Sequence, residues 1–252
     1  MVFKARLYFY FDNLIFKKNE CYEKTFFTGH HDCFYIFFLP VRPKLKKHGE
    51  NSKPSTYGFK KNFDTIQLIA PDTMGGKSLM QAFQHRKSDR EFKQTPLSLK
   101  HLSEILWAAY GINRPDGKRT VPSAMALYPL QVYAVLSNGI YRYEPQPHRL
   151  VPVVKGDYRK LAGLQDFVYT APLNLIFIAD FNKYNLTQKE PDVNSMRMVS
   201  LDAGHCTQNV YLYCASEGLK CVVRAGAKSD ELLSLLGLDS HYRFIVAQTV
   251  GY

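Results

Sequence analysis

The chain has 252 residues, of which 46% are hydrophobic, and a formal net charge of +11. This length allows one sizeable domain, or one domain with an appendage, and the composition is that of a globular protein with a real core. Five cysteines, an odd number without a C-x-x-C pair, argue against a disulfide framework and favour a reducing, cytoplasmic location.

Most of the basic excess belongs to the N-terminal quarter. Residues 1–62 hold 12 Lys/Arg and 5 Asp/Glu, a net charge of +7. Their aromatic clusters, LYFYFDNLIF and CFYIFFLP, have neither the layout of a cleavable signal nor the length to span a bilayer, so we expect no transmembrane segment. Residues 41–62 are polar and contain proline, as a linker does.

We therefore divide the chain into a basic, aromatic-rich extension and linker at residues 1–62, which we expect to be poorly ordered, and a folded domain at residues 63–252. Two other interpretations of the first 40 residues stay open. They could bind a membrane surface or a partner, or they could be a stretch that does not belong to the working protein.

From residue 63 the pattern becomes regular. Residues 66–70 are typical of a short strand. Ser78 can cap a helix that places Leu79, Ala82 and Phe83 inward and ends near His85. A second helix is predicted from Ser98 to the stop at Gly111, because its apolar residues form one stripe: Leu99, Leu102, Ile105, Leu106 and Ala109.

The next elements are predicted strands. Residues 130–145 alternate on both sides of Asn138-Gly139, a dipeptide that suits a type I′ turn, so they predict a β-hairpin. Residues 174–181, NLIFIADF, form a continuous apolar run of strand length, which indicates a central strand buried on both faces.

The C-terminal third mixes both kinds of element. A long helix is predicted over residues 198–218 with Gly218 as its end, and a short helix over residues 230–236. Residues 221–223 and 244–250 are expected to be strands. Since helices and strands do not alternate strictly, the predicted class is α+β, with one sheet and several helices against it.

Several familiar site patterns are missing. There is no G-x-G-x-x-G, and GGKS at residues 75–78 is not a P-loop because Pro71 stands where that pattern needs glycine. His30, His31, Asp32 and Cys33 lack a second spaced pair of ligands, so we expect no metal site. His101, His148, His205 and His241 have no recognisable partner pattern and are interpreted as surface or core histidines.

The segment HRKSDREF, residues 85–92, concentrates charge around a serine. Arg86 and Arg90 are four residues apart, so a helical turn would place both on one face with Ser88 beside them. Two guanidinium groups and a hydroxyl suit a phosphate. The alternative is a solvated helix end whose cations pair with Asp89 and Glu91. A second unusual stretch, RTVPSAMALYPL at residues 119–130, forms a turn that could lie against a flat aromatic ligand.

These segments occur together in one known family. RKSDREF, PLSLKHLSEILWAAYGINR and RTVPSAMALYPL, followed by QDFVYTAPLNLIFIAD, LDAGHCTQNVYLYCASEGLKCVVRAGA, ELLSLLGL and the terminal VGY, resemble the nitroreductase superfamily of FMN-dependent oxidoreductases. The chain is most similar to the branch that includes the thiazole/oxazole-forming azoline dehydrogenases. The resemblance covers about residues 66–252 and does not extend to residues 1–62.

The resemblance implies a nitroreductase-like fold, a central and mainly antiparallel sheet flanked by helices, in an obligate type of homodimer with flavin sites at the subunit interface. The helix at residues 198–218 would build much of that interface. The implied flavin-binding residues come from four segments: Arg86, Ser88 and Arg90 at the phosphate and ribityl chain; Pro122, Ser123 and Ala124 from the other subunit beside the ring; Gln165; and Val223, Arg224, Ala225 and Gly226 along the N5 side.

The resemblance also implies the activity. NADH or NADPH would deliver hydride to N5 of FMN, and a small-molecule acceptor such as a nitroaromatic or a quinone would then take the electrons. No side chain needs to act as a general acid or base. Where many relatives carry Asn, Gln and an aromatic residue, this chain has Ala126, Tyr128 and Leu130. Arg224 could replace a basic residue that some members place near the phosphate.

Two alternative functions stay open. The branch resemblance allows dehydrogenation of azoline rings in a modified peptide, which would require partner proteins. The chain could instead be a non-catalytic basic module that uses residues 1–62 on an anionic surface. For the enzyme itself we expect no nucleic acid partner.

Overall fold

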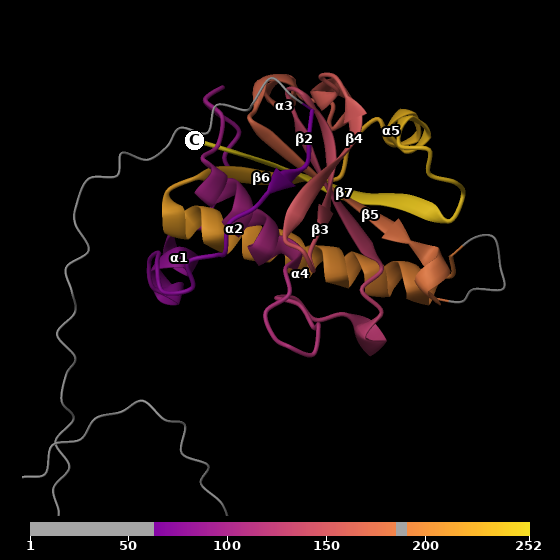
Figure 1. Ribbon diagram of the computed structural model, residues 1–252, viewed down its shortest axis with the longest axis horizontal. Helices are drawn as coiled ribbons and strands as arrows, with labels where there is room; N and C mark the ends of the chain where they lie inside the picture. The colour runs from indigo at the N-terminus through magenta and orange to yellow at the C-terminus, as the bar shows by residue number, and fades with distance from the viewer. Residues whose placement is uncertain (1–62, 185–190) are drawn as a thin grey trace, which may run out of the picture. The chain divides into compact units, whose positions relative to one another are not determined.

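The computed structural model describes residues 63–184 and 191–252. The predicted extension and linker at residues 1–62, and the histidines at positions 30 and 31, lie outside the described residues. The described chain forms a seven-stranded sheet in the order β1-β4-β3-β2-β5-β7-β6 (Figure 1). Every neighbouring pair in it is antiparallel. The strands are β1 (Ile66–Gln67), β2 (Leu130–Leu136), β3 (Gly139–Glu144), β4 (Arg149–Lys155), β5 (Leu173–Asp180), β6 (Lys220–Arg224) and β7 (Tyr242–Gly251).

Helices cover both faces of this sheet. They are α1 (Leu79–His85), α2 (Leu99–Tyr110), α3 (Asp166–Thr170), α4 (Val193–Glu217) and α5 (Ser229–Leu235), with short 3₁₀ turns η1 (Ala124–Ala126), η2 (Arg159–Leu161) and η3 (Phe181–Tyr184). One hydrophobic core lies between the sheet and the pair α2 and α4, and a second lies between the sheet and the pair α3 and α5. In Figure 1, α4 runs across the sheet beside α2, and α5 lies apart from them. The predicted α+β class with a flanked antiparallel sheet is confirmed.

The central position of β5 is also confirmed. Its residues from Leu173 to Ala179 are all buried. Leu175 and Phe177 belong to the core under α2 and α4, whereas Ile176 and Ile178 belong to the core under α3 and α5. The continuous apolar run in the sequence therefore arises because alternating side chains enter two different cores.

Helix α4 is longer than the sequence pattern indicated. It begins at Val193, five residues before the predicted start, because Asp192 caps it by accepting a hydrogen bond from Ser195 N–H at 2.7 Å. It ends at Gly218, as predicted, where φ is +73° and a side chain would be strained.

Two predictions near the N-terminus of the domain were wrong in detail. The strand expected over residues 66–70 forms sheet pairs only at Ile66 and Gln67. Of the three α1 residues expected to face inward, only Ala82 is buried, while Leu79 and Phe83 are 60% and 49% exposed. A helix of two turns offers only a narrow strip to α4, and Ala82 fills that strip.

The hairpin is confirmed, but its turn is not the predicted one. Leu136 pairs with Gly139, so the loop consists of Ser137 and Asn138, and neither has the positive φ that a type I′ turn requires. Gly139 serves packing instead: a Cβ atom there would lie 2.1 Å from the ring of Phe63. The glycine allows Phe63 to lie against β3.

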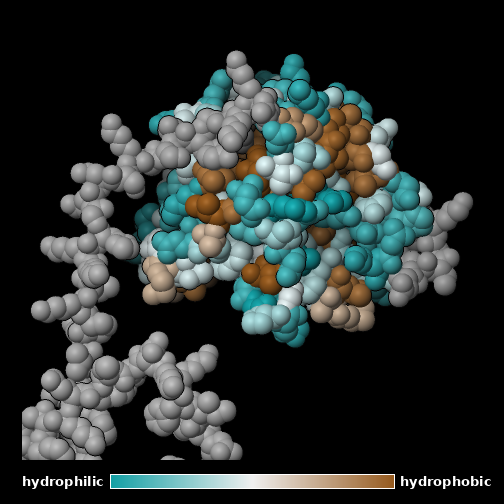
Figure 2. Space-filling model, viewed as in Figure 1, coloured by the Kyte–Doolittle hydropathy of each residue, from teal (hydrophilic) through white to brown (hydrophobic). Residues whose placement is uncertain are grey.

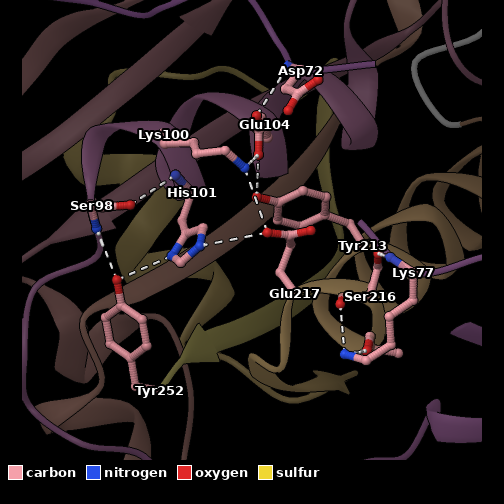
Figure 3. A network of polar contacts seen from close by, with 11 residues as sticks. Asp72, Lys77, Ser98, Lys100, His101, Glu104, Tyr213, Ser216, Glu217 and Tyr252 are labelled. Carbon is pink, nitrogen blue, oxygen red and sulfur yellow. Dashed lines mark hydrogen bonds and ion pairs between the residues drawn. The ribbon is translucent and has the colours of Figure 1, made fainter. Parts of the chain in front are cut away.

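A polar network joins α2, α4 and the chain ends of the domain (Figure 3). At its centre the Glu104 carboxylate, which is 4% exposed, accepts hydrogen bonds from Lys100 Nζ at 2.7 Å, Tyr213 OH at 2.6 Å and Asp72 N–H at 3.0 Å. Burial acts to raise the pKa of Glu104, but these three donors hold the pKa below its ordinary value. The carboxylate is therefore ionised and bound from three sides.

Replacing Glu104 with Gln is expected to lower the free energy of unfolding at pH 7 by about 2 to 4 kcal/mol, because it leaves Lys100 and Tyr213 with a poorer acceptor in a buried place. A depressed carboxyl pKa stabilises the fold above the pKa of the unfolded chain and stops doing so as the pH falls through the folded pKa. The loss measured by urea denaturation should therefore shrink below about pH 4.

Glu231→Gln is the matched control, since the exposed Glu231 only pairs with Lys228 at 3.3 Å on the surface of α5. We expect it to change stability by about 0.5 kcal/mol or less. Equal losses in the two variants would show that the Glu104 network is not a stabilising centre.

Candidate functional site

The charged segment 85–92 is not helical beyond its first residue. Helix α1 ends at His85, and Arg86 is extended, with φ −60° and ψ 120°. The hypothesis that Arg86 and Arg90 share one face of a helical turn is therefore wrong. The segment instead runs beside the edge strand β6, where Asp89 N–H donates to Cys221 O at 3.0 Å. In this segment the Asp89 N–H is bonded to the edge strand β6 and not to a carbonyl group of a continued α1.

The two arginines of this segment keep their charge available. The nearby carboxylate of Asp89 forms an ion pair with Lys87 instead, with 3.2 Å between Lys87 Nζ and Asp89 Oδ2. Burial acts to raise the pKa of Asp89, but the Glu91 N–H and the Lys87 ammonium hold it below its ordinary value. Arg86, Ser88 and Arg90 are exposed, and in the described part of the chain neither arginine forms an ion pair. The alternative of a solvated helix end whose cations pair with Asp89 and Glu91 is therefore confirmed for Lys87 and Asp89 but not for the two arginines.

Tyr211 of α4 connects this segment to the end of β6. Its hydroxyl accepts a hydrogen bond from Val223 N–H at 2.9 Å and lies 2.7 Å from Ser88 Oγ. The guanidinium of Arg86 lies 5.4 Å from the centre of the Tyr211 ring. One hydroxyl thus fixes the separation of two chain segments that were each predicted to contact a flavin.

The last residues of β6 alternate between the interior and the surface. Val223 and Ala225 are exposed, whereas Arg224 is buried. The Arg224 guanidinium donates to four oxygen atoms: Ala162 O at 2.7 Å, Thr249 Oγ1 at 3.0 Å, Asn174 Oδ1 at 3.2 Å and Gly226 O at 3.5 Å. Burial lowers the pKa of Arg224 to about 10, so it stays charged at neutral pH. The Arg224 side chain is therefore buried in the interior, and only the backbone of Arg224 borders the surface.

The loop that carries Gln165 meets this end of β6. Gly163 has no space for a side chain, because a Cβ atom would lie 2.0 Å from Arg224 Nη1. Next to it, Leu164 Cδ1 lies 3.4 Å from the position of a Cβ on Gly226. Gln165 is exposed and precedes α3 without capping it through its side chain. The structure therefore brings the loop of Gln165 to residues 223–226, as the predicted site requires.

Residues 122–124 lie in a different part of the domain. Ser123 Oγ donates to Asp202 Oδ2 at 2.6 Å and accepts from Tyr128 N–H at 3.0 Å. Burial raises the pKa of Asp202, although the hydrogen bond from Ser123 opposes that shift. Among the described residues, no hydrogen bond or ion pair joins this loop to Arg86, Ser88 or Arg90.

A cavity of about 580 Å³ lies beside Tyr211, between α1, α4 and the start of β6. Its wall carries more positive than negative side chains, with Lys77, Arg86, Lys87 and Lys220 against Asp89. Sequence reasoning missed Tyr211 and this cavity. The only signal for Tyr211 was a tyrosine within an apolar helix, and such a residue is usually part of a core.

No group of His, Cys, Asp and Glu in residues 63–184 and 191–252 has the arrangement of a metal site. Across the same residues, no helix combines the length and the hydropathy needed to cross a membrane.

Comparison with known proteins points to one family. Residues 83–252 match the model of the nitroreductase family. A Methanocaldococcus jannaschii protein named as a nitroreductase is 35% identical over 188 residues, which are 71% of this chain and 93% of the relative. A crystal structure named as a nitroreductase of Ralstonia eutropha is 39% identical, with a TM-score of 0.69, over 80% of this chain and 95% of that chain.

Two solved structures of lower identity share the fold. A chain of the Escherichia coli microcin synthetase complex with its truncated pro-peptide is 21% identical, with a TM-score of 0.55, over 86% of this chain and 84% of that one. The NADPH:FMN oxidoreductase from Vibrio harveyi in complex with NAD⁺ is 18% identical, with a TM-score of 0.52, over 69% of this chain and 68% of that one.

Tyr211→Phe removes the hydroxyl that joins Ser88 to Val223 and leaves both groups without this partner. We expect the free energy of unfolding to fall by about 1 to 2 kcal/mol. Hydrogen exchange at the Val223 amide should become faster, because its acceptor is lost. Tyr169→Phe is the control, since its hydroxyl makes only a 3.5 Å contact with Leu164 O. Unchanged protection at Val223 in Tyr211→Phe would contradict the bridging role.

Proposed function

Because the chain belongs to the nitroreductase family and is an oxidoreductase, we propose that it binds FMN and passes electrons from NADH or NADPH to a small organic acceptor such as a nitroaromatic or a quinone. The observation that carries this proposal is the hydroxyl bridge of Tyr211. It holds an exposed cationic segment beside the exposed end of β6, and these are the two surfaces that a flavin mononucleotide needs.

The residues at the first surface fit a phosphate. Arg86 and Arg90 are exposed cations without an acidic partner in the described chain, and the Ser88 hydroxyl lies between them in sequence. A guanidinium presents planar N–H pairs that match phosphate oxygens, and it stays charged at every physiological pH. We assign Arg86, Ser88 and Arg90 to the phosphate and ribityl chain.

The second surface fits the flavin ring. Val223 and Ala225 expose apolar surface, and the backbone from Val223 to Gly226 borders it beside Gln165. When bound, FMN supplies the ability to accept and deliver hydride, and the protein supplies position and electrostatics. The buried Arg224 adds a fixed positive charge beneath this surface, which favours a bound group that gains negative charge during reduction.

We propose a homodimer in which Pro122, Ser123 and Ala124 of one subunit reach the flavin of the other. Large apolar side chains are exposed on the elements concerned: Met125 is 75% exposed in the loop and Leu201 is 58% exposed on α4. On the face seen in Figure 2, apolar surface occurs in several places between polar regions. Association of two copies would bury apolar side chains of this kind.

The similarity to a chain of the microcin synthetase complex favours one second candidate, dehydrogenation of an azoline ring in a modified peptide. That structure contains a pro-peptide and covers more of this chain than the Vibrio harveyi enzyme does. The alternative of a basic binding module depends on residues 1–62, which lie outside the described residues. A cytoplasmic location remains our expectation, and the described cysteines, Cys206, Cys214 and Cys221, are free thiols.

Arg86→Ala tests the phosphate assignment. We expect a folded protein whose affinity for FMN falls about tenfold or more, because a charge-assisted pair with the phosphate is lost. The measurement is the visible flavin absorption of the purified full chain, followed by titration of the flavin-free protein with FMN. Lys155→Ala is the matched control, since Lys155 is an exposed cation on β4 outside the proposed flavin residues and should affect FMN little. Full flavin retention in Arg86→Ala would refute the assignment.

Anaerobic addition of NADH or NADPH tests the activity. The flavin absorption of the unmodified protein is expected to bleach with at least one of the two donors and to return when a quinone or a nitroaromatic compound is added. A flavin that neither donor reduces would contradict the reductase proposal and leave the azoline substrate to be tested.

A further inference from the structure

A second cavity lies beside the loop that contains Ser123, because Tyr128 in its wall donates its N–H to Ser123 Oγ. Its volume is about 390 Å³, within the range of small-molecule sites. The start of β2, the end of β3 and the loop at residues 145–147 form its walls, and Arg119 and Tyr128 line it. None of the residues assigned to FMN lines this cavity.

Arg119 has an unusual environment in this cavity. Its guanidinium carbon lies 4.0 Å from the centre of the Tyr110 ring and 5.0 Å from that of Tyr128. Nη1 donates to Tyr110 O at 3.0 Å. Nε is buried and has no hydrogen-bond acceptor among the described residues. A buried donor on a charged group is costly to leave unpaired, and an anion that binds the guanidinium would offset part of that cost.

The loop that supplies Tyr128 is strained. Met125, Ala126 and Tyr128 have φ values of +53°, +53° and +47°, a region that side chains other than glycine rarely adopt. Hydrogen bonds hold Tyr128 in place: its N–H donates to Ser123 Oγ, and its hydroxyl accepts from Arg119 N–H at 3.4 Å. Strain of this kind persists where the surrounding structure enforces it, and it is concentrated at binding sites. Here it places an aromatic ring against the guanidinium.

The charges of the wall select an anion. Glu144 is already paired with Arg142 at 3.0 Å and with Arg149 at 2.8 Å. Asp180 accepts hydrogen bonds from the backbone and side chain of Asn182. Lys183 is exposed at the rim and forms no ion pair within the described chain. Asp180 keeps its charge, because its donors are neutral. The three cations of the wall, Arg119, Arg142 and Lys183, therefore exceed its two carboxylates, Glu144 and Asp180, by one charge, and Arg119 and Lys183 form no ion pair among the described residues.

The remaining wall is mixed: it contains the aliphatic residues Pro129, Leu130, Val132, Pro145 and Pro147 beside the polar residues Gln131, Tyr143 and Gln146. We propose that this cavity is a binding site for a short aliphatic carboxylate, whose oxygens pair with Arg119 and whose chain lies against the prolines and Leu130. A carboxylate matches the planar guanidinium in geometry as well as in charge. This site is separate from the flavin site and does not depend on the reductase proposal.

Fluorine NMR of the full chain tests this site with 4,4,4-trifluorobutanoate and, as a neutral probe of the same shape, 4,4,4-trifluorobutanamide. We expect the carboxylate to bind at least about fivefold more tightly than the amide, because only the carboxylate pairs with the charge of Arg119. Equal affinities, or no detectable binding of the carboxylate, would overturn the proposal.

Three variants locate the binding. Arg119→Gln should weaken the carboxylate about tenfold, and Lys183→Glu about two- to fivefold through repulsion at the rim. Lys155→Glu makes the same change of charge at an exposed position of β4 outside the cavity and should have no effect. If Arg119→Gln does not fold, the comparison of Lys183→Glu with Lys155→Glu still tests the proposed location of the carboxylate. Equal carboxylate affinities of these two variants would overturn the proposal.

Flavin provides the last control. The three variants are expected to retain the FMN content of the unmodified protein, and saturating FMN should leave the affinity for the carboxylate unchanged within about twofold. Displacement of the carboxylate by FMN would place it in the flavin site and overturn the proposal of a separate cavity.

Discussion

The burial of helix α4 across one face of the sheet is the constraint on which the rest of the domain depends. Polar groups that this helix carries into contact with other segments need hydrogen-bond partners there. Some partners lie in α2 and β6, and others lie in segments without regular structure. Asp202 bonds Ser123 in the loop before β2, Tyr211 bonds Ser88, and Ser216 accepts from Lys77 N–H at 2.7 Å. The helix therefore helps to position three loops through specific hydrogen bonds, and the cationic segment is one of those loops.

The buried charges of Glu104 and Arg224 are stabilised in different ways against the cost of desolvation. Glu104 is balanced by the cation of Lys100 and by neutral donors, so its charge is largely neutralised within the network of Figure 3. Arg224 bonds only neutral oxygens, those of Ala162, Asn174, Thr249 and Gly226. Its positive charge is stabilised by dipoles but not cancelled, and it therefore acts on its surroundings. This difference follows from position, because Glu104 joins two helices whereas Arg224 lies under the exposed end of β6.

The loop before β2 combines backbone strain with a buried acid. Three residues with positive φ would not hold that conformation alone, since each costs of the order of 1 kcal/mol or more. The hydroxyl of Ser123 supplies the restraint, because it accepts from Tyr128 N–H while it donates to Asp202. The same restraint fixes the direction of Ser123 and the ring of Tyr128. A short polar side chain at position 123 thus sets the geometry of the whole turn.

The features that could be predicted from the sequence are those with a local cause. The stripe of α2, the apolar run of β5 and the stop at Gly218 depend on neighbours within a few residues, and all three are confirmed. Most of the features that were missed depend on distant partners, whereas the early start of α4 has a local cause in the Asp192 cap. Tyr211 is 123 residues from Ser88, so its role in joining the segments of the candidate site has no periodic signal. The same holds for segment 86–92: its composition indicated an anion-binding role, but its extended path is accompanied by contacts with Cys221 and Tyr211, which are distant in the sequence. The composition of a segment identifies the ligands that its side chains can bind, whereas tertiary contacts determine the backbone conformation that positions those side chains.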